Sequence, residues 1–228
     1  MLDGPISPLY SLADMITEAI ETLTTSDGVR LDARLGAPQA PRGGVVIAHP
    51  HPLYGGDMDN PVVVRLAEVC GEVELATLRF NFRGTGQSTG VHGHGTDEPH
   101  DVEAARARLA TLVGDGRPMV LAGYSFGAAV VADVALRHAD LAGVVLVAPP
   151  LARVDPTRLA ALEHFGEGLL VVAGSHDEIC PVDGLERLRK SAPRATVHII
   201  EGANHFFFGK LYPLGEAVTA WARSTLPS

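Results

Sequence analysis

Short apolar runs, separated by longer stretches with helical spacing, recur along most of the chain. The runs that predict strands are residues 21–25, 29–35, 44–48, 74–82, 119–122, 143–148, 169–173 and 196–200. Several of them, such as 143–148, are apolar throughout rather than alternating with polar residues. That pattern is typical of parallel strands buried on both faces of a sheet.

Between these runs, apolar residues spaced three and four apart predict helices. The predicted helices are residues 61–70, 101–113, 128–136, 182–191 and 215–224. In the second of these, one face carries Val102, Ala105, Leu109, Leu112 and Val113. Ser26-Asp27-Gly28 predicts a hairpin between the first two strands. The alternation of strand and helix predicts an α/β fold with a doubly wound, mostly parallel sheet.

The length of 228 residues fits one domain, which we place at residues 16–228. Residues 1–15 have no counterpart in the pattern and are expected to be an N-terminal extension. The only irregular insertion, residues 149–166, contains Pro149, Pro150 and Pro156. It is too short for a second domain, and we expect it to form a minimal lid.

Charge and composition argue against several classes of binding partner and indicate a cellular location. A net charge of −9 argues against nucleic acid or an anionic membrane as a partner. No apolar stretch is long enough to span a bilayer. The first twenty residues carry Asp3, Asp14 and Glu18 and no Lys or Arg, so they are not expected to be a secretory signal. With only two cysteines, Cys70 and Cys180, a reducing, cytoplasmic location is expected.

The pentapeptide Gly123-Tyr124-Ser125-Phe126-Gly127 lies between the strand at 119–122 and the helix at 128–136. A serine held by two glycines between a strand and a helix has the layout of a nucleophile elbow. The turn strains the serine backbone, and its neighbours two positions away must be small where strand and helix meet. Ser125 is therefore the predicted nucleophile.

A serine nucleophile needs a base and an acid that orients the base. Asp177 follows the strand at 169–173 and His205 follows the strand at 196–200, in the chain order expected of this arrangement. Asp177 could instead only begin a turn, with Glu178 or Asp183 as the acid. His205 could be a structural loop histidine; His176 is the competing base, although it is adjacent to Asp177 and poorly placed to bind it.

The loop after the strand at 44–48 is expected to supply one backbone donor to an oxyanion hole. Proline has no N–H, so Pro50 and Pro52 are excluded and His51 is the best-placed donor, with Leu53 behind it. The second donor is expected to be the N–H of Phe126.

Two His-x-His pairs, at 49–51 and 92–94, also raise the question of a metal. Neither has the further ligands that a hydrolytic metal centre needs, so no metal or cofactor is expected. His92, His94 and His100 are expected to be solvated loop residues. Arg83 is expected to be a structural ion-pair partner, and Phe206-Phe207-Phe208 to belong to the core.

Taken together, these motifs resemble the α/β-hydrolase superfamily. In particular the chain is similar to the small predicted hydrolases related to dienelactone hydrolase and serine aminopeptidase-like enzymes. The matching segments cover about residues 19–228 and are 49–56, 80–88, Glu98 with Asp101, 123–127, Asp177 and His205. The chain departs from dienelactone hydrolase in having Ser125 where that enzyme has a cysteine. Residues 1–15 are also atypical.

The resemblance implies an α/β-hydrolase fold and Ser-His-Asp chemistry, without naming a substrate. We expect a serine hydrolase, most simply a carboxylesterase, that cleaves small carboxylic esters through an acyl-enzyme. The expected partner is a small-molecule ester, and the sequence carries no signal for an oligomeric state. Two alternatives stay open: a small-peptide hydrolase with the same triad, and a non-catalytic binding scaffold.

Overall fold

The computed structural model describes residues 17–152, 159 and 161–227. The predicted extension 1–15 lies outside the described residues, as does part of the predicted insertion. Within the described residues, none of the helices is long and apolar enough to cross a membrane.

The eight strands and five helices that the hydrophobic pattern predicts follow one another in the predicted order, and the short helices η2 and η3 are additional. The strands are β1 (Ala19–Thr24), β2 (Arg30–Gly36), β3 (Gly43–Ala48), β4 (Leu75–Phe80), β5 (Met119–Tyr124), β6 (Gly143–Val147), β7 (Leu169–Gly174) and β8 (Thr196–Ile200). The helices are η2 (Pro52–Tyr54), α1 (Pro61–Glu72), α2 (Glu98–Val113), α3 (Phe126–Ala135), η3 (Ala161–Gly168), α5 (Val182–Ser191) and α6 (Leu211–Thr225).

Over the described part of the chain, eight strands form one sheet in the order β1-β2-β4-β3-β5-β6-β7-β8. The hairpin β1–β2 and the pair β2–β4 are antiparallel, whereas every other pair is parallel. All residues of β3 to β7 are buried, because helices cover both faces of these strands. The prediction of a doubly wound, mostly parallel sheet is confirmed.

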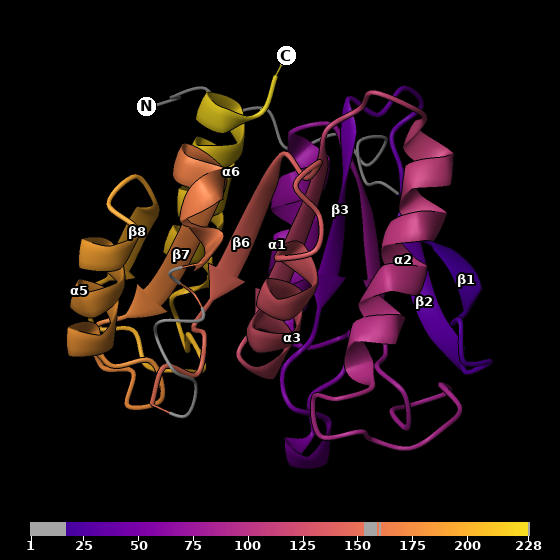
Figure 1. Ribbon diagram of the computed structural model, residues 1–228, viewed down its shortest axis with the longest axis horizontal. Coiled ribbons are helices and arrows are strands. Elements are labelled where there is room, and N and C mark those ends of the chain that lie inside the picture. The colour runs from indigo at the N-terminus through magenta and orange to yellow at the C-terminus, as the bar shows by residue number, and fades with distance from the viewer. Residues whose placement is uncertain (1–16, 153–158, 160, 228) are drawn as a thin grey trace, which may run out of the picture.

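Helices pack on the two faces in separate layers (Figure 1). Helices α2 and α3 contact each other and the strands β3, β5 and β6, and α1 and α6 pair on the opposite face. The β6 and β7 arrows point to the lower edge of the view, where the loops after the parallel strands gather. Groups on these loops therefore converge at one edge of the sheet.

Strand register brings two pairs of loops together at that edge. Ala48, the last residue of β3, is paired with Gly123 of β5, so the loop that begins at His49 lies beside the turn at Ser125. Gly174 of β7 is paired with Ile200 of β8, which brings the loops after these two strands side by side.

Three predictions about individual side chains need correction. Leu112, assigned to the buried face of α2, is 37% exposed, whereas the other four residues of that face are buried. Of the three consecutive phenylalanines, only Phe207 is buried, and Phe206 and Phe208 are exposed. Phe207 has a positive φ of 53°, so the backbone turns there and sends the neighbouring rings outward.

Candidate active site

Ser125 lies in a sharp turn between the end of β5 and the start of α3. Its φ of 54° and ψ of −114° are outside the regions that most side chains adopt. The two flanking residues must be glycines because a side chain at either position would clash with the backbone. A Cβ on Gly123 would lie 2.4 Å from the carbonyl oxygen of Gly127, and a Cβ on Gly127 would lie 2.4 Å from the carbonyl oxygen of Ala48. The backbone can make this turn only because both positions lack a side chain.

His205 and Asp177 come from the loops after β8 and β7. The Ser125 Oγ lies 2.9 Å from His205 Nε2, and His205 Nδ1 lies 2.8 and 3.0 Å from the two carboxylate oxygens of Asp177. Both side chains are buried. The structure therefore brings the three sequence-predicted residues together in a continuous hydrogen-bonded relay.

The Asp177 carboxylate is fixed by its own loop. Its Oδ1 accepts hydrogen bonds from the N–H groups of Ile179 and Cys180, at 2.9 and 2.8 Å. Gly174 lets this loop approach the next one closely, because a Cβ there would lie 2.2 Å from the carbonyl oxygen of Ala203. The competing acids Glu178 and Asp183 and the competing base His176 are all exposed.

Tyr124 holds the histidine loop and was not predicted from the sequence. Its hydroxyl donates a 2.8 Å hydrogen bond to the carbonyl oxygen of His205, and its ring lies 5.7 Å from the His205 ring. Burial raises the pKa of the Tyr124 hydroxyl, so the hydroxyl stays a donor. A tyrosine in an otherwise apolar buried strand needs a hydrogen-bond partner, and this was the signal available in the sequence.

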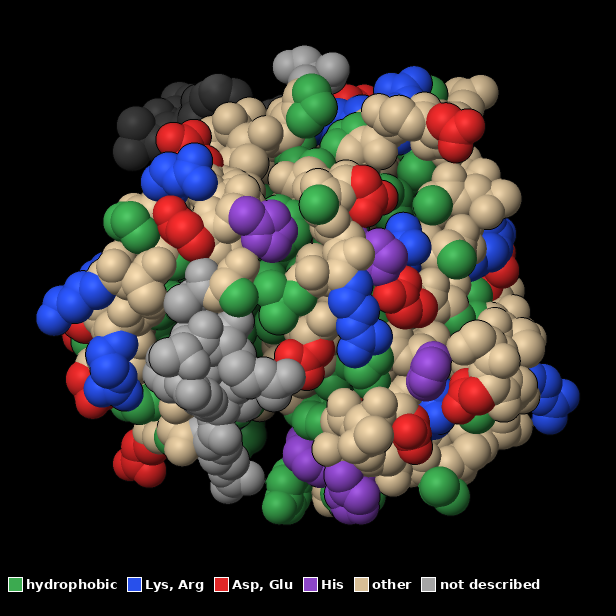
Figure 2. All heavy atoms as spheres, in the orientation of Figure 1, with side chains coloured by type: hydrophobic (Ala, Val, Ile, Leu, Met, Phe, Trp, Pro, Cys, Tyr) green, Lys and Arg blue, Asp and Glu red, His purple; other side chains and the backbone are tan. Residues whose placement is uncertain are grey.

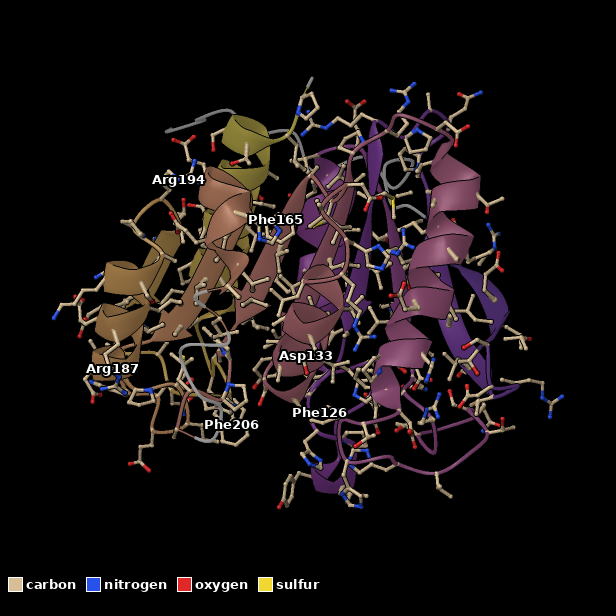
Figure 3. All side chains as sticks on the ribbon, viewed as in Figure 1. Phe126, Asp133, Phe165, Arg187, Arg194 and Phe206 are labelled. Carbon is tan, nitrogen blue, oxygen red and sulfur yellow. The ribbon has the colours of Figure 1, made fainter. Side chains whose placement is uncertain are left out.

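The two residues expected to supply the oxyanion donors have side chains in contact with each other. Phe126 is the first residue of α3, where no carbonyl within the helix can accept its N–H. His51 lies on the loop after β3, directly before η2, and its ring centroid is 4.8 Å from that of Phe126. Figure 3 shows Phe126 and Phe206 at the same edge of the sheet, the latter from the histidine loop.

His49 has a structural role. Its Nδ1 lies 2.6 Å from the carbonyl oxygen of Pro50, and its Nε2 accepts the N–H of Phe82 at 3.0 Å. Burial lowers the pKa of His49 to about 4. Both nitrogens are occupied and the ring is neutral, so His49 is not available as a metal ligand. Within the described residues, no group of three or more His, Cys, Asp or Glu side chains is arranged to hold a metal ion.

The loop between β4 and α2 is anchored by buried charges. Arg83 pairs with Asp101 at 2.7 Å and with Asp27 at 2.8 Å, as expected of a structural ion-pair residue. Glu98 accepts the N–H groups of Gly93 and Gly95 at 2.7 Å each. These contacts hold the loop against the hairpin on one side and next to Phe126 on the other.

The expectation of three solvated histidines in this loop is partly wrong. His94 and His100 are exposed, but the side chain of His92 is only 6% exposed. Sequence reasoning missed this residue because glycines flank it and no apolar pattern surrounds it. Burial here arises from tertiary packing of the loop against His51 and Phe126.

Comparison with known proteins gives a consistent result. Residues 41–211 match the protein family described as "Alpha/beta hydrolase domain". An α/β serine hydrolase homologue from Coxiella burnetii is 32% identical, with a TM-score of 0.78 over 89% of this chain and 96% of that chain. An a/b serine hydrolase without lid from Xanthomonas campestris is 28% identical, with a TM-score of 0.80 over 97% of this chain and 99% of that chain. An uncharacterized protein of Rickettsia prowazekii is 28% identical over 82% of this chain and 80% of its own length.

Proposed function

Because this chain belongs to the α/β-hydrolase domain family, we propose that it is a serine hydrolase that cleaves small carboxylic esters. The observation that carries the proposal is the unbroken relay from Ser125 through His205 to Asp177. A serine hydroxyl hydrogen-bonded to an imidazole that is itself bound to a buried carboxylate is the arrangement that activates serine as a nucleophile.

In the proposed reaction Ser125 Oγ attacks the ester carbonyl while His205 Nε2 takes the hydroxyl proton. Asp177 keeps the remaining proton on Nδ1 and stabilises the imidazolium that forms. The C–O bond to the alcohol then breaks as His205 returns the proton to the leaving oxygen. Water attacks the resulting acyl-enzyme by the same steps, releasing the acid and restoring Ser125.

The N–H groups of Phe126 and His51 are the proposed oxyanion donors. The α3 N-terminus adds a favourable dipole at the same place. Each donor of this kind contributes about 10²–10³ in rate. Every proposed step is supplied by side chains and backbone of this chain, so no metal or cofactor is required.

Esters are favoured over the alternatives by what the site contains. A small-peptide hydrolase would need a group that binds the substrate amine, and the exposed acid Asp183 already pairs with Arg187. A binding scaffold would not need the short contact between Ser125 and His205. The Xanthomonas relative is described as lacking a lid, and a similarly open site here fits small substrates.

The test is covalent labelling with a fluorophosphonate probe together with a screen of p-nitrophenyl esters, amides and thioesters. We expect labelling and ester turnover in the wild type, neither in Ser125→Ala, and no effect of EDTA on either. Labelling without ester turnover, but with release of amines from short peptides, would favour the peptidase. Absence of labelling would favour the scaffold.

A further inference from the structure

A second carboxylate–histidine pair lies beside Phe126, outside the proposed triad. His92 Nδ1 is 2.7 Å from Glu98 Oε1, and the Glu98 side chain is fully buried. The His92 ring centroid is 5.4 Å from that of Phe126 and 5.0 Å from that of His51. Both proposed oxyanion residues thus border this pair.

The loop itself fixes the carboxylate that faces His92. Glu98 accepts the N–H groups of Gly93 and Gly95, one on each side of His94. The contact from Glu98 to His92 Nδ1 is short, although it lacks the angle of a regular hydrogen bond. An acceptor beside Nδ1 favours the tautomer with its proton on that nitrogen, which leaves Nε2 as a hydrogen-bond acceptor.

His92 Nε2 is buried and has no hydrogen-bond partner among residues 17–152, 159 and 161–227. A buried polar atom without a partner costs free energy, and native structures contain few of them. The nearest rings are those of Phe126, His51 and His94, and no described side chain or backbone group donates a hydrogen bond to His92 Nε2. A group on a bound molecule would satisfy this atom.

The position of the pair fits contact with a substrate. A Cβ on Gly95 would lie 3.8 Å from the Phe126 ring, so the loop that carries His92 covers that ring. Histidine side chains lie at the lower edge of the space-filling view, in the region below α3 in Figure 1 (Figure 2). This edge is where Ser125 is presented.

We propose that Glu98 and His92 form a specificity site that accepts a hydrogen bond from a hydroxyl group carried by the substrate ester. The inference rests on the proposed ester hydrolysis and names its substrate class, hydroxylated esters. A carboxylate or phosphate on the substrate is disfavoured, because the Nε2 lone pair and the Glu98 charge both repel an anion. The site is buried beside the Phe126 ring, which favours a neutral hydroxyl over an ammonium group, because an ammonium group is costly to desolvate.

The test compares matched esters that differ only in one substituent. The acyl series is the p-nitrophenyl esters of butyric, 3-hydroxybutyric and 3-methoxybutyric acid; the alcohol series is propyl, 3-hydroxypropyl and 3-methoxypropyl acetate. We expect kcat/KM to be at least about tenfold higher for the hydroxyl member of one series. The methoxy member should show no gain, because it cannot donate a hydrogen bond yet has a similar inductive effect.

Two variants assign the effect to His92. His92→Phe keeps the ring volume and should reduce the hydroxyl advantage, the ratio of kcat/KM for the hydroxyl ester to that for the unsubstituted ester, to about one. His100→Phe, an exposed histidine that contacts Ser26, should keep the advantage. A preference that persists in His92→Phe, or a stronger preference for a hemisuccinate ester, would overturn the inference.

A measurement that needs no turnover separates this inference from the proposed function. Nitrogen-15 spectra of the His92 ring should show the proton on Nδ1 in the wild type, and the ring signals should shift with 3-hydroxybutyramide and not with butyramide. Hydrolysis of plain butyrate without hydroxyl preference would refute the specificity site alone. If no ester is cleaved, the proposed function is wrong, and the titration with the two amides then tests the specificity site by itself. A His92 ring with its proton on Nε2, and no selective shift with 3-hydroxybutyramide, would refute the specificity site.

Discussion

At the scale of the residue, the relay defines three expected kinetic effects. Ser125→Ala should lower ester turnover by roughly 10⁴–10⁶, because the nucleophile is lost while the fold keeps its glycine-flanked turn. His205→Ala should cost a similar factor, and the double variant little more, since the residues act as a unit. Asp177→Asn should cost somewhat less. The measurement is kcat on p-nitrophenyl acetate, with circular dichroism to verify folding.

One result would show that Ser125 is not the nucleophile. If folded Ser125→Ala kept a tenth of wild-type turnover, the nucleophile would have to be another group. Glu178→Gln is the matched control for Asp177→Asn, because it makes the same chemical change on the same loop at an exposed position. It should leave kcat within about twofold of the wild type.

Tyr124 provides a second prediction at this scale. Tyr124→Phe removes the hydroxyl that donates to the His205 carbonyl and leaves that buried acceptor unpaired. We expect a loss of about 1–3 kcal/mol in the free energy of unfolding. A small displacement of His205 should also lower kcat by about tenfold with KM nearly unchanged.

The conservative control is Tyr212→Phe, at an exposed position on α6. Equal kcat values for Tyr124→Phe and the wild type, despite lowered stability, would mean that the hydroxyl stabilises the fold without positioning His205. Measuring kcat and KM separately, together with urea unfolding, distinguishes the two roles.

Residues were predictable from the sequence where local geometry constrains them. Gly123 and Gly127 leave no room for a side chain, so the elbow is visible as a pattern of five residues. Asp177 and His205 could be chosen because each follows a predicted strand. His92 and the role of Tyr124 could not be predicted, because the burial of one and the partner of the other depend on loops that meet only in the folded molecule.

At the scale of the element, the buried strands were the most predictable part. Strands β3 to β7 are covered on both faces, so their apolar character is continuous. Burial is less predictable from the sequence at the ends of helices and in loops. Leu112 lies in the last turn of α2 and is exposed although Val113 beside it is buried, and Phe206 and Phe208 lie on either side of the turn at Phe207.

The segment between β6 and β7 supports a prediction about acyl chain length. Three leucines of this segment, Leu151, Leu159 and Leu162, are buried in the core cluster. Phe165 is half-buried against the same cluster. Because these side chains pack in the core, they cannot also enclose a long acyl chain.

We therefore expect kcat/KM on p-nitrophenyl esters to peak at acetyl to butyryl and to fall at octanoyl. Each enclosed methylene contributes roughly 0.8 kcal/mol, and further methylenes would stay in water. The measurement is a chain-length series at substrate concentrations below micelle formation. An optimum at dodecanoyl or longer, with activation at a lipid interface, would contradict it and require a larger mobile cover.

At the scale of the whole molecule, buried His49 couples folding stability to pH. Its two ring nitrogens join the ends of β3 and β4, through Pro50 and the N–H of Phe82. In the unfolded chain the pKa of a histidine is about 6.5, whereas burial lowers the pKa of His49 in the fold to about 4. Above about pH 6.5 both states are neutral, and His49 adds no pH dependence.

As pH falls from about 6.5 to about 4, only the unfolded state binds the proton, so the free energy of unfolding should decrease. The expected slope is about 1.4 kcal/mol per pH unit, or about 3 kcal/mol over the whole interval, with no further contribution below about pH 4. His49→Gln offers an acceptor to Phe82 and a donor to Pro50 without a titrating group. It should be less stable than the wild type at neutral pH, and the difference should shrink as the solution is acidified.

The measurement is urea unfolding across this pH range for the wild type, His49→Gln and the exposed control His100→Gln. The difference between wild type and His49→Gln isolates the contribution of His49 from the many other groups that titrate. His100→Gln should run parallel to the wild type. If His49→Gln also ran parallel to the wild type, protonation of His49 would not be linked to unfolding, and acid would have to act on the fold through other buried groups such as the Arg83–Asp101 pair.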